Sequence, residues 1–416
     1  MEDKFSEIAM NAKIASKQIA VLSTEVKNQA LLNIAKCIEY NKDKIFEANK
    51  SDLNSAKLLV EKGEITQSTF NRLKLDENKM RDMIQGIKDI AALEDPIGKV
   101  LLKRELDEDL VLTKISCPIG VLGIIFEARP DVITQISALA IKSSNAVILK
   151  GGKESINTNK AIMSVIQDAL NKTENFPKNV LNQVFTRDDV AEMLKQDKYI
   201  DLIIPRGGNK LVKFIKENTK IPVLGHADGI CHIYVDEFAD MEKAIKIIID
   251  AKTQYPSACN SVETVLVNSK IDNSKLKEAL ENAGIEIIST PESWHKEYGE
   301  KKLSYKTVNS LEEAIEHINT FSSGHTESII TENSDRAKIF LSAVDSAGVY
   351  HNVSTRFADG FRYGFGAEVG ISTNKTHARG PVGLDGLTIY KYTIHGNGQI
   401  VKDYAEGIKS FHHKDI

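Results

Sequence analysis

Cys259 is the residue whose type and setting point most directly to chemistry. It lies in residues 255–261 (YPSACNS), between a helix predicted at 241–249 and a strand predicted at 264–267. Pro256 disfavours continuation of the helix, so the cysteine is expected on a turn. A thiolate on a turn with free backbone N–H groups nearby is placed to attack a carbonyl group. Spacing alone fits a buried structural cysteine as well, which is the commoner fate of a single cysteine.

The other cysteines suggest packing rather than chemistry. Cys37 and Cys117 lie in apolar runs and are expected in the core. Cys231 precedes His232, which could activate it, but neighbours in a strand point to opposite faces. The four cysteines share no CxxC or zinc-type spacing, so the sequence predicts neither a disulfide framework nor a metal site.

Two glycine pairs directly follow predicted strands at 145–149 and 202–204. Glycine lets a backbone approach a phosphate group closely, and lysines flanking the first pair could hold a nucleotide ribose or phosphate. Neither pair forms a GxGxxG or Walker A loop, and a turn with solvated lysines fits the spacing equally well. The residues concerned are Lys150, Gly151, Gly152, Lys153, Gly207 and Gly208.

Length and charge bound the class of protein. The chain has 416 residues, which indicates two to three domains, and 54 Lys plus Arg against 58 Asp plus Glu give a net charge of −4. This near balance argues against a nucleic-acid protein and against a polybasic membrane binder. No apolar run reaches the ~18 residues of a membrane span, and residues 1–5 lack the apolar stretch of a secretory signal. We therefore expect a cytoplasmic protein with reduced thiols.

The elements that must position these residues alternate along the chain. Residues 1–60 have helical periodicity, and residues 100–116 predict a hairpin around an acidic turn. Strands and helices then alternate over 131–235 and again over 236–355, which predicts two doubly wound parallel sheets. Such sheets bind ligands at the carboxyl ends of their strands, where both glycine pairs would lie.

The last part of the chain is rich in glycine and aromatic residues. Residues 357–385 contain six glycines with interleaved aromatics and charges, which favours an ordered functional loop. Residues 387–394 and 399–401, joined by His395-Gly396-Asn397-Gly398, predict a second hairpin.

Three segments together resemble the gamma-glutamyl phosphate reductase family. They are residues 117–131 (CPIGVLGIIFEARPD), 256–263 (PSACNSVE) and 357–386. The resemblance extends from the first helix to the end of the chain in the same order. This family, also called glutamate-5-semialdehyde dehydrogenase, belongs to the aldehyde dehydrogenase superfamily.

The resemblance implies an α/β, aldehyde dehydrogenase-like fold with two doubly wound α/β domains and a small β hairpin element. The NADP-binding domain would comprise residues 1–98 and 117–235, rejoined by about 356–385. The catalytic domain, with the nucleophilic cysteine, would span 236–355. Residues 99–116 and 386–416 would form the β element that makes a homo-oligomer.

The implied activity is the second step of proline biosynthesis from glutamate. The Cys259 thiolate would attack L-glutamyl 5-phosphate and expel phosphate, and NADPH would reduce the resulting thioester to L-glutamate 5-semialdehyde. Covalent catalysis of this kind divides one difficult displacement into two easier steps. Association with glutamate 5-kinase, which makes the labile substrate, is a further implied partnership.

The resemblance also implies roles for individual residues. Cys259 occupies the nucleophile position, and Asn260 or Arg129 would supply the side-chain part of the oxyanion hole. Arg129, His226 and Arg379 would bind the substrate carboxylate or phosphate. The expected cofactor ligands are Lys150, Gly151, Gly152, Gly207, Gly208 and Glu368.

Two departures from the wider superfamily bear on the reaction. Hydrolytic aldehyde dehydrogenases carry a glutamate in an E-L-G-G segment that activates water, and the matching segment here, residues 224–229 (LGHADG), has no glutamate at that place. Ala128 stands where their oxyanion asparagine lies. The first difference suits a substrate that releases phosphate, because no hydrolytic water is needed. A hydrolytic aldehyde dehydrogenase and a non-catalytic member of the same fold are the alternative readings.

Overall fold

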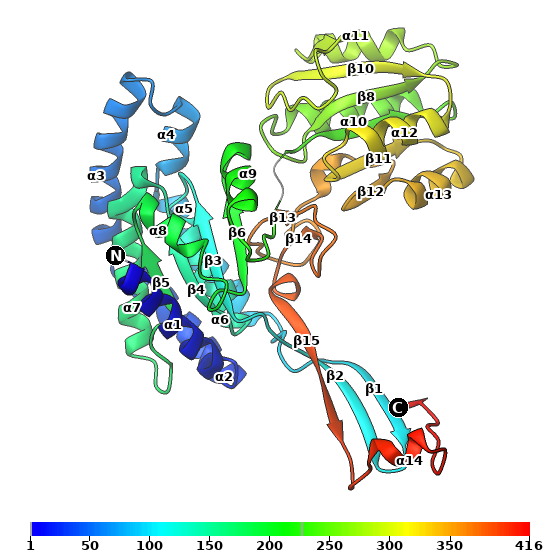
Figure 1. Ribbon diagram of the computed structural model, residues 1–416. Helices are drawn as coiled ribbons and strands as arrows, with labels where there is room; N and C mark the ends of the chain where they lie inside the picture. The colour runs from blue at the N-terminus through cyan, green and yellow to red at the C-terminus, as the bar shows by residue number, and fades with distance from the viewer. Residues whose placement is uncertain (1, 226–227) are drawn as a thin grey trace.

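The computed structural model describes residues 2–225 and 228–416, and three sheets organise this part of the chain. Two are parallel and belong to two α/β lobes, and the third is an antiparallel arm (Figure 1). The α/β fold class predicted from the sequence, with two doubly wound lobes and a small β element, is confirmed.

The first parallel sheet has the strand order β5-β4-β3-β6. Its strands are β3 (Val121–Phe126), β4 (Ala146–Lys150), β5 (Leu181–Val184) and β6 (Leu202–Arg206). The chain continues from β3 to β4 and β5 on one side, and then places β6 on the other side of β3. This reversal makes the β3/β6 boundary the switch point of the sheet, where doubly wound folds open a crevice.

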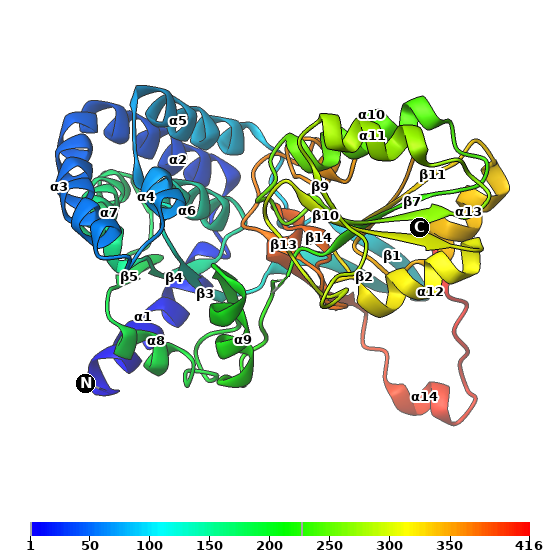
Figure 2. The same cartoon turned by 90° about the horizontal axis from the view of Figure 1, so that it is seen from above.

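Helices cover both faces of this sheet, because its strands are apolar on both sides. Figure 2 shows α2 and α5 on one side of the sheet and α1, α8 and α9 on the other. The buried residues form one apolar cluster on each face. The helices are α1 (Glu2–Ile19), α2 (Thr24–Tyr40), α3 (Lys42–Glu61), α4 (Gln67–Leu73), α5 (Glu77–Ala92), α6 (Val132–Lys142), α7 (Ile156–Asn171), α8 (Arg187–Met193) and α9 (Asn209–Glu217), with the 3-10 turn η1 (Lys153–Ser155).

The second parallel sheet has the order β12-β11-β7-β8-β10-β9. It is sandwiched between α10 and α11 on one face and α12 and α13 on the other, again with one apolar cluster per face. Its strands are β7 (Cys231–Val235), β8 (Val262–Asn268), β9 (Glu286–Ile288), β10 (Lys302–Val308), β11 (Thr326–Ile330) and β12 (Gly348–His351). Its helices are α10 (Met241–Thr253), α11 (Ser274–Asn282), α12 (Leu311–Phe321) and α13 (Ser334–Ala343).

The third sheet is an antiparallel arm with the order β15-β2-β1-β16. It is built from β1 (Val100–Asp107), β2 (Leu110–Pro118), β15 (Thr388–His395) and β16 (Lys414–Asp415). It projects away from both lobes (Figure 1). The hairpin predicted at 100–116 is confirmed as β1 and β2, with Asp109 in the left-handed conformation at the turn (φ 56°).

The second predicted hairpin, over 387–401, is wrong. β15 pairs along its whole length with β2, and residues after Gly398 form the short helix α14 (Val401–Ala405) instead of a returning strand. The apolar residues of 387–394 have an extended partner far away in sequence, so no local strand is needed to pair with them. Residues 222–224, which follow α9, contribute only an isolated bridge between Ile203 and Val223.

The glycine-rich stretch lies between the two parallel sheets in both views (Figures 1 and 2). It contains η2 (Thr355–Phe357), the two-stranded ribbon of β13 (Ile371–Ser372) and β14 (Gly380–Pro381), and η3 (Asp385–Leu387). Its buried residues Val369, Val382 and Leu387 join the apolar cluster of the first sheet. The chain therefore returns to the first lobe after it has built the second.

None of the helices in residues 2–225 and 228–416 is both long and apolar enough to cross a membrane.

Candidate active site

A cleft of about 1570 Å³ lies along the carboxyl edge of the first parallel sheet. All four strands of that sheet run parallel, so the loops that follow them meet at this edge and line the cleft together. The second lobe closes part of it with the turn that carries Cys259. The loop residues after β3, β4, β5 and β6 that line it include Glu127, Arg129, Lys150, Gly152, Thr186, Arg187, Gly207 and Gly208.

Most of the residues singled out in the sequence meet in this cleft. Cys259 and Glu368 come from segments distant in the chain from the strand-end loops, yet line the same space. The members of the predicted site that line the cleft are Arg129, Lys150, Gly152, Gly207, Gly208, Cys259 and Glu368.

The turn that carries Cys259 is held on several sides. Ser261 bonds back to the end of α10 through its hydroxyl, which donates to the Ala251 carbonyl at 3.0 Å. The Thr355 hydroxyl donates to the Asn260 carbonyl at 2.7 Å, and the Cys231 thiol donates to the Cys259 carbonyl at 3.3 Å. A nucleophile held this way needs little reorganisation before it reacts.

Gly229 allows the close approach of another chain segment to this turn. A Cβ atom at Gly229 would lie 2.3 Å from the carbonyl oxygen and 2.4 Å from the Cα atom of Cys259. Both contacts are with backbone, which cannot rotate away as a flexible side chain can. The space behind Cys259 therefore admits glycine alone at this position.

A buried ion pair joins the two elements on either side of the turn. The Lys252 ammonium at the end of α10 lies 2.9 Å from the Glu263 carboxylate at the start of β8, and both side chains are fully buried. Glu263 also accepts hydrogen bonds from the Tyr298 and Gly299 backbone. Burial raises the pKa of Glu263 to about 7 although the Lys252 charge opposes the shift, and burial lowers the pKa of Lys252. The pair ties the end of α10 to the start of β8, the two elements that flank the turn of Cys259.

The two cysteines near this turn differ in chemical character. Cys259 is partly exposed and lines the cleft, whereas Cys231 is fully buried. Burial, reinforced by the nearby Glu327 charge, raises the pKa of the Cys231 thiol well above its ordinary value. A thiol in that state is a poor nucleophile.

Several predicted site residues do not face the cleft. The Asn260 amide donates to the Ala358 carbonyl at 2.8 Å, so its N–H is directed into the protein rather than at a carbonyl on Cys259. Arg379 pairs with Asp345 at 3.0 Å on the second lobe and lies outside the cleft lining. A Cβ atom at Gly151 would meet Asn159 and Phe126, so this glycine serves packing. His226 lies outside the described residues.

The sequence reasoning passed over Arg206. It ends β6 and lines the cleft, where its charge interacts with those of Cys259 and Arg129. The signal was available, because Arg206 directly precedes Gly207 at the end of a predicted strand.

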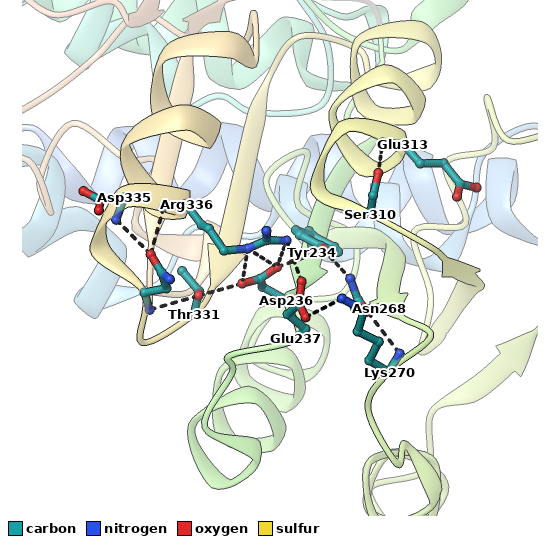
Figure 3. A network of polar contacts seen from close by, with 11 residues as sticks. Tyr234, Asp236, Glu237, Asn268, Lys270, Ser310, Glu313, Thr331, Asp335 and Arg336 are labelled. Carbon is teal, nitrogen blue, oxygen red and sulfur yellow. Dashed lines mark hydrogen bonds and ion pairs between the residues drawn. The ribbon is translucent and has the colours of Figure 1, made fainter.

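The corresponding edge of the second sheet is filled by a polar network (Figure 3). The fully buried Asp236, after β7, accepts hydrogen bonds from both Nε and Nη2 of Arg336, with the shortest at 2.7 Å. It also accepts from the Thr331 and Tyr234 hydroxyls. Because these partners come from β7, the end of β11 and α13, the network occupies the switch point of this sheet. A ligand there would have to displace a fully paired carboxylate.

Comparison with known proteins places this geometry in a family. The sequence model of the aldehyde dehydrogenase family matches residues 2–290. Gamma-glutamyl phosphate reductase of Brachyspira hyodysenteriae is 61% identical over 427 aligned positions that cover 99% of each chain.

Solved structures agree with the sequence matches. The crystal structure of gamma-glutamyl phosphate reductase from Thermotoga maritima has a TM-score of 0.91 at 39% identity, covering 95% of this chain and 99% of that one. Glyceraldehyde-3-phosphate dehydrogenase from Methanocaldococcus jannaschii, solved in complex with NADP, shares the fold, with a TM-score of 0.68 at 16% identity over 95% of each chain. The chain therefore belongs to the gamma-glutamyl phosphate reductase family, within the aldehyde dehydrogenase family.

Proposed function

We propose that the protein reduces L-glutamyl 5-phosphate to L-glutamate 5-semialdehyde and phosphate with NADPH, through a thioester on Cys259. This is the reaction of the second step of proline biosynthesis from glutamate. The observation that carries the proposal is a partly exposed cysteine on a firmly held turn, facing a cleft at the carboxyl edge of a parallel sheet. Family membership at 61% identity supports the same reaction.

The residues of the cleft fit a nicotinamide dinucleotide. At about 1570 Å³ the cleft exceeds the roughly 300–1,000 Å³ of a typical small-molecule site, so it has room for a dinucleotide and a substrate together. Gly207 and Gly208 lead into the N-terminus of α9, where backbone N–H groups suit a pyrophosphate. Lys150 would hold a ribose after β4, and Glu368 would hold the other. Gly152 lines the same end of the cleft.

Positive charge near the ends of β4 and β5 favours NADPH over NADH. Lys150, Lys153 and Arg187 line the cleft there. A 2′-phosphate on the adenosine ribose would find cations at this end, which is the usual basis for NADP preference in such folds.

The chain's own groups divide the work of the acyl transfer. The Cys259 thiolate attacks the acyl carbon, the C–O bond to phosphate breaks, and the electron pair leaves with the phosphate. The backbone N–H of Cys259 has no acceptor among the described residues, so it is available to stabilise the oxyanion that forms. A nicotinamide cofactor supplies the hydride when bound. Release of the semialdehyde returns Cys259 to its starting state.

The chain lacks the glutamate that activates water in hydrolytic aldehyde dehydrogenases. Residues 224–229, the segment that resembles the glutamate-bearing one of hydrolytic aldehyde dehydrogenases, contain no glutamate, and their buried, apolar Leu224 lines the cleft. A thioester on Cys259 would therefore lack this general base for its hydrolysis.

We further propose a cytoplasmic homo-oligomer. The four cysteines are unpaired, which suits a reducing compartment, and the arm exposes apolar side chains suited to self-association. An acyl phosphate is labile in water, which favours close association with the glutamate 5-kinase that makes it.

The reaction is best tested in reverse, because the acyl phosphate substrate is unstable. Glutamate 5-semialdehyde, NADP and phosphate are supplied, and the absorbance of the reduced cofactor is followed. Phosphate-dependent reduction that disappears in Cys259→Ala is the expected result. Reduction without phosphate would indicate a hydrolytic dehydrogenase, and no reduction with any nicotinamide cofactor would point to a non-catalytic member of the fold.

A further inference from the structure

Arg206 is a cation that lines the cleft. Within the part of the chain that the structure describes, its guanidinium makes a single hydrogen bond, a long one of 3.5 Å from Nη1 to the Glu368 carbonyl. Among residues 2–225 and 228–416 it forms no ion pair within 4.0 Å. A guanidinium carries five N–H donors, so most of its capacity to bind an anion is unused.

A second guanidinium lies close to the first. Arg129 lines the same cleft, pairs with Asp131 at 3.1 Å and keeps a side chain that is 48% exposed. The backbone brings the two arginines together, because Phe126 of β3 is in register with Arg206 of β6 and the Glu127 amide donates to the Arg206 carbonyl. Arg129 therefore follows β3 at the switch point while Arg206 ends the adjacent strand.

The neighbouring charges of Arg206 and Arg129 favour the binding of an anion. Burial lowers the pKa of Arg206, and the Arg129 charge lowers it further, while Glu368, the Cys259 thiolate and Asp131 act in the opposite direction. The Glu368 carboxylate also accepts a hydrogen bond from the Gly360 backbone N–H at 2.9 Å. Like charges held together cost free energy, and an anion between them removes that cost.

The Arg206 side chain is held in place by the returning glycine-rich stretch. A Cβ atom at Gly370 would lie 3.3 Å from the Arg206 Cδ atom, so the glycine leaves room for the arginine stem to lie against this backbone. Gly370 has φ of 151°, a conformation that side-chain-bearing residues rarely adopt. The stem of Arg206 therefore packs against the backbone at Gly370, next to the Glu368 carbonyl that accepts from its guanidinium.

We propose that Arg206, with Arg129 beside it, binds the phosphate group of the acyl phosphate while Cys259 attacks the adjacent carbonyl carbon. This inference rests on the proposed function. As the Cys259 Sγ–C bond forms, the C–O bond breaks and the phosphate gains a full negative charge. A guanidinium on the phosphate oxygens meets charge that grows in the transition state, so it accelerates expulsion of the leaving group.

The test compares Arg206→Gln and Arg206→Lys with the natural protein in the reverse reaction. We expect Arg206→Gln to raise the KM for phosphate tenfold or more and to leave the KM for NADP within about twofold. Arg206→Lys keeps the charge but loses the two parallel N–H donors of the guanidinium. Its KM for phosphate should therefore lie between the values of the natural protein and Arg206→Gln. The control is Lys213→Gln, which removes a cation from α9 that is 75% exposed and outside the cleft lining.

A second measurement does not require turnover. Inorganic phosphate should slow alkylation of Cys259 by iodoacetamide in the natural protein, read by mass spectrometry of the peptide that contains it. The same phosphate concentration should give no protection in Arg206→Gln, whereas Lys213→Gln should be protected. Thermal unfolding of each variant checks that the fold is kept.

The outcomes separate the inference from the proposed function. Absence of phosphate-dependent reduction in the natural protein would overturn the proposed function itself. Phosphate-dependent reduction with an unchanged phosphate KM in Arg206→Gln would overturn the role of Arg206. A raised KM for NADP alone would reassign Arg206 to a cofactor phosphate.

Discussion

Cys259 owes its setting to its immediate neighbours in space. The turn is tied to α10, to η2 and to Cys231 by hydrogen bonds, and Gly229 packs directly against its backbone. Such contacts fix the position of a nucleophile to a fraction of an ångström, and an error of about 1 Å can cost on the order of 100-fold in rate. Geometry at the level of single atoms therefore limits what this site tolerates.

Gly229→Ala should disable the enzyme without removing any catalytic group. Its Cβ atom would fall within 2.4 Å of the Cys259 backbone, so the turn must shift. We expect kcat to fall by about 100-fold or more, from the sensitivity of reaction to misplacement. The control is Gly86→Ala within α5, where an added Cβ meets nothing within 4 Å. Equal activity of the two variants would show that the turn accommodates a side chain.

Lys150→Ala tests the cofactor end of the cleft. Lys150 ends β4 and lines the cleft, where it is expected to contact a ribose. The variant should raise the KM for NADPH more than the KM for the acyl substrate, measured by steady-state kinetics beside Lys172→Ala on the exposed end of α7. An unchanged KM for NADPH would remove Lys150 from the cofactor site.

At the scale of elements, the two parallel sheets use the same edge in opposite ways. The first sheet leaves its carboxyl edge open as the cleft, whereas the second closes it with the Asp236 network that links β7, β11 and α13 (Figure 3). Burial disfavours the charged Asp236, but its hydrogen bonds with Arg336, Thr331 and Tyr234 outweigh burial and lower the pKa of Asp236. The network thus joins strand ends and helix into one rigid layer.

Asp236→Asn should lower the free energy of unfolding by about 3 kcal/mol at pH 7. This is the lower end of the cost of breaking a buried ion pair, because the Arg336 side chain is partly exposed to solvent. The pKa of Asp236 in the folded protein lies below its value of about 3.9 in the unfolded chain. The Asp236 carboxylate therefore contributes fully to stability above about pH 3.9, and this contribution is lost as the pH falls through the folded pKa. Urea unfolding followed by Trp294, the single tryptophan, measures the difference between the two proteins.

The matched control for this experiment is Asp335→Asn. Asp335 is 84% exposed and pairs with an exposed lysine, so its removal should change stability by less than about 1 kcal/mol. A difference between natural protein and Asp236→Asn that stays constant from pH 7 to below pH 4 would contradict the assigned ionisation.

At the scale of the whole molecule, the arm exposes an apolar strand edge that nothing in the single chain covers among the described residues. Its sheet ends on one side with β15, which has no strand beyond it among the described residues. Ile389, Tyr390, Tyr392 and Ile394 of that strand are all 45–59% exposed. An edge strand with apolar side chains on both faces is a template for pairing with another chain.

Ile394→Arg should therefore reduce the proposed homo-oligomer to smaller species. The substitution places a charge on the exposed edge strand, where a second copy would have to bury it. Size-exclusion chromatography with light scattering measures the mass, and Tyr40→Arg, at an exposed position on α2, serves as control. The same mass for both variants would show that the arm does not assemble the protein through this edge.

Local patterns along the chain determined which segments form strands and helices, and at which edge of the sheet a ligand site lies. Alternating apolar strands and helices predicted two parallel sheets, and glycines after two strands predicted the edge at which a ligand site would form. These inferences succeed because strand and helix periodicity depend on neighbours in sequence. The turn before β8 was likewise recognisable, since proline and small residues act locally.

Contacts between distant segments were decided only by the tertiary structure. Arg206 meets Arg129 and Glu368 because two strands pair and a segment 162 residues later folds back beside them. Asn260 turns toward Ala358 and Arg379 toward Asp345, although both were expected to face substrate. Strand β15 pairs with β2 rather than with residues 399–401, which follow it in sequence. Side-chain direction and strand partnership depend on packing across the whole chain, which no local pattern contains.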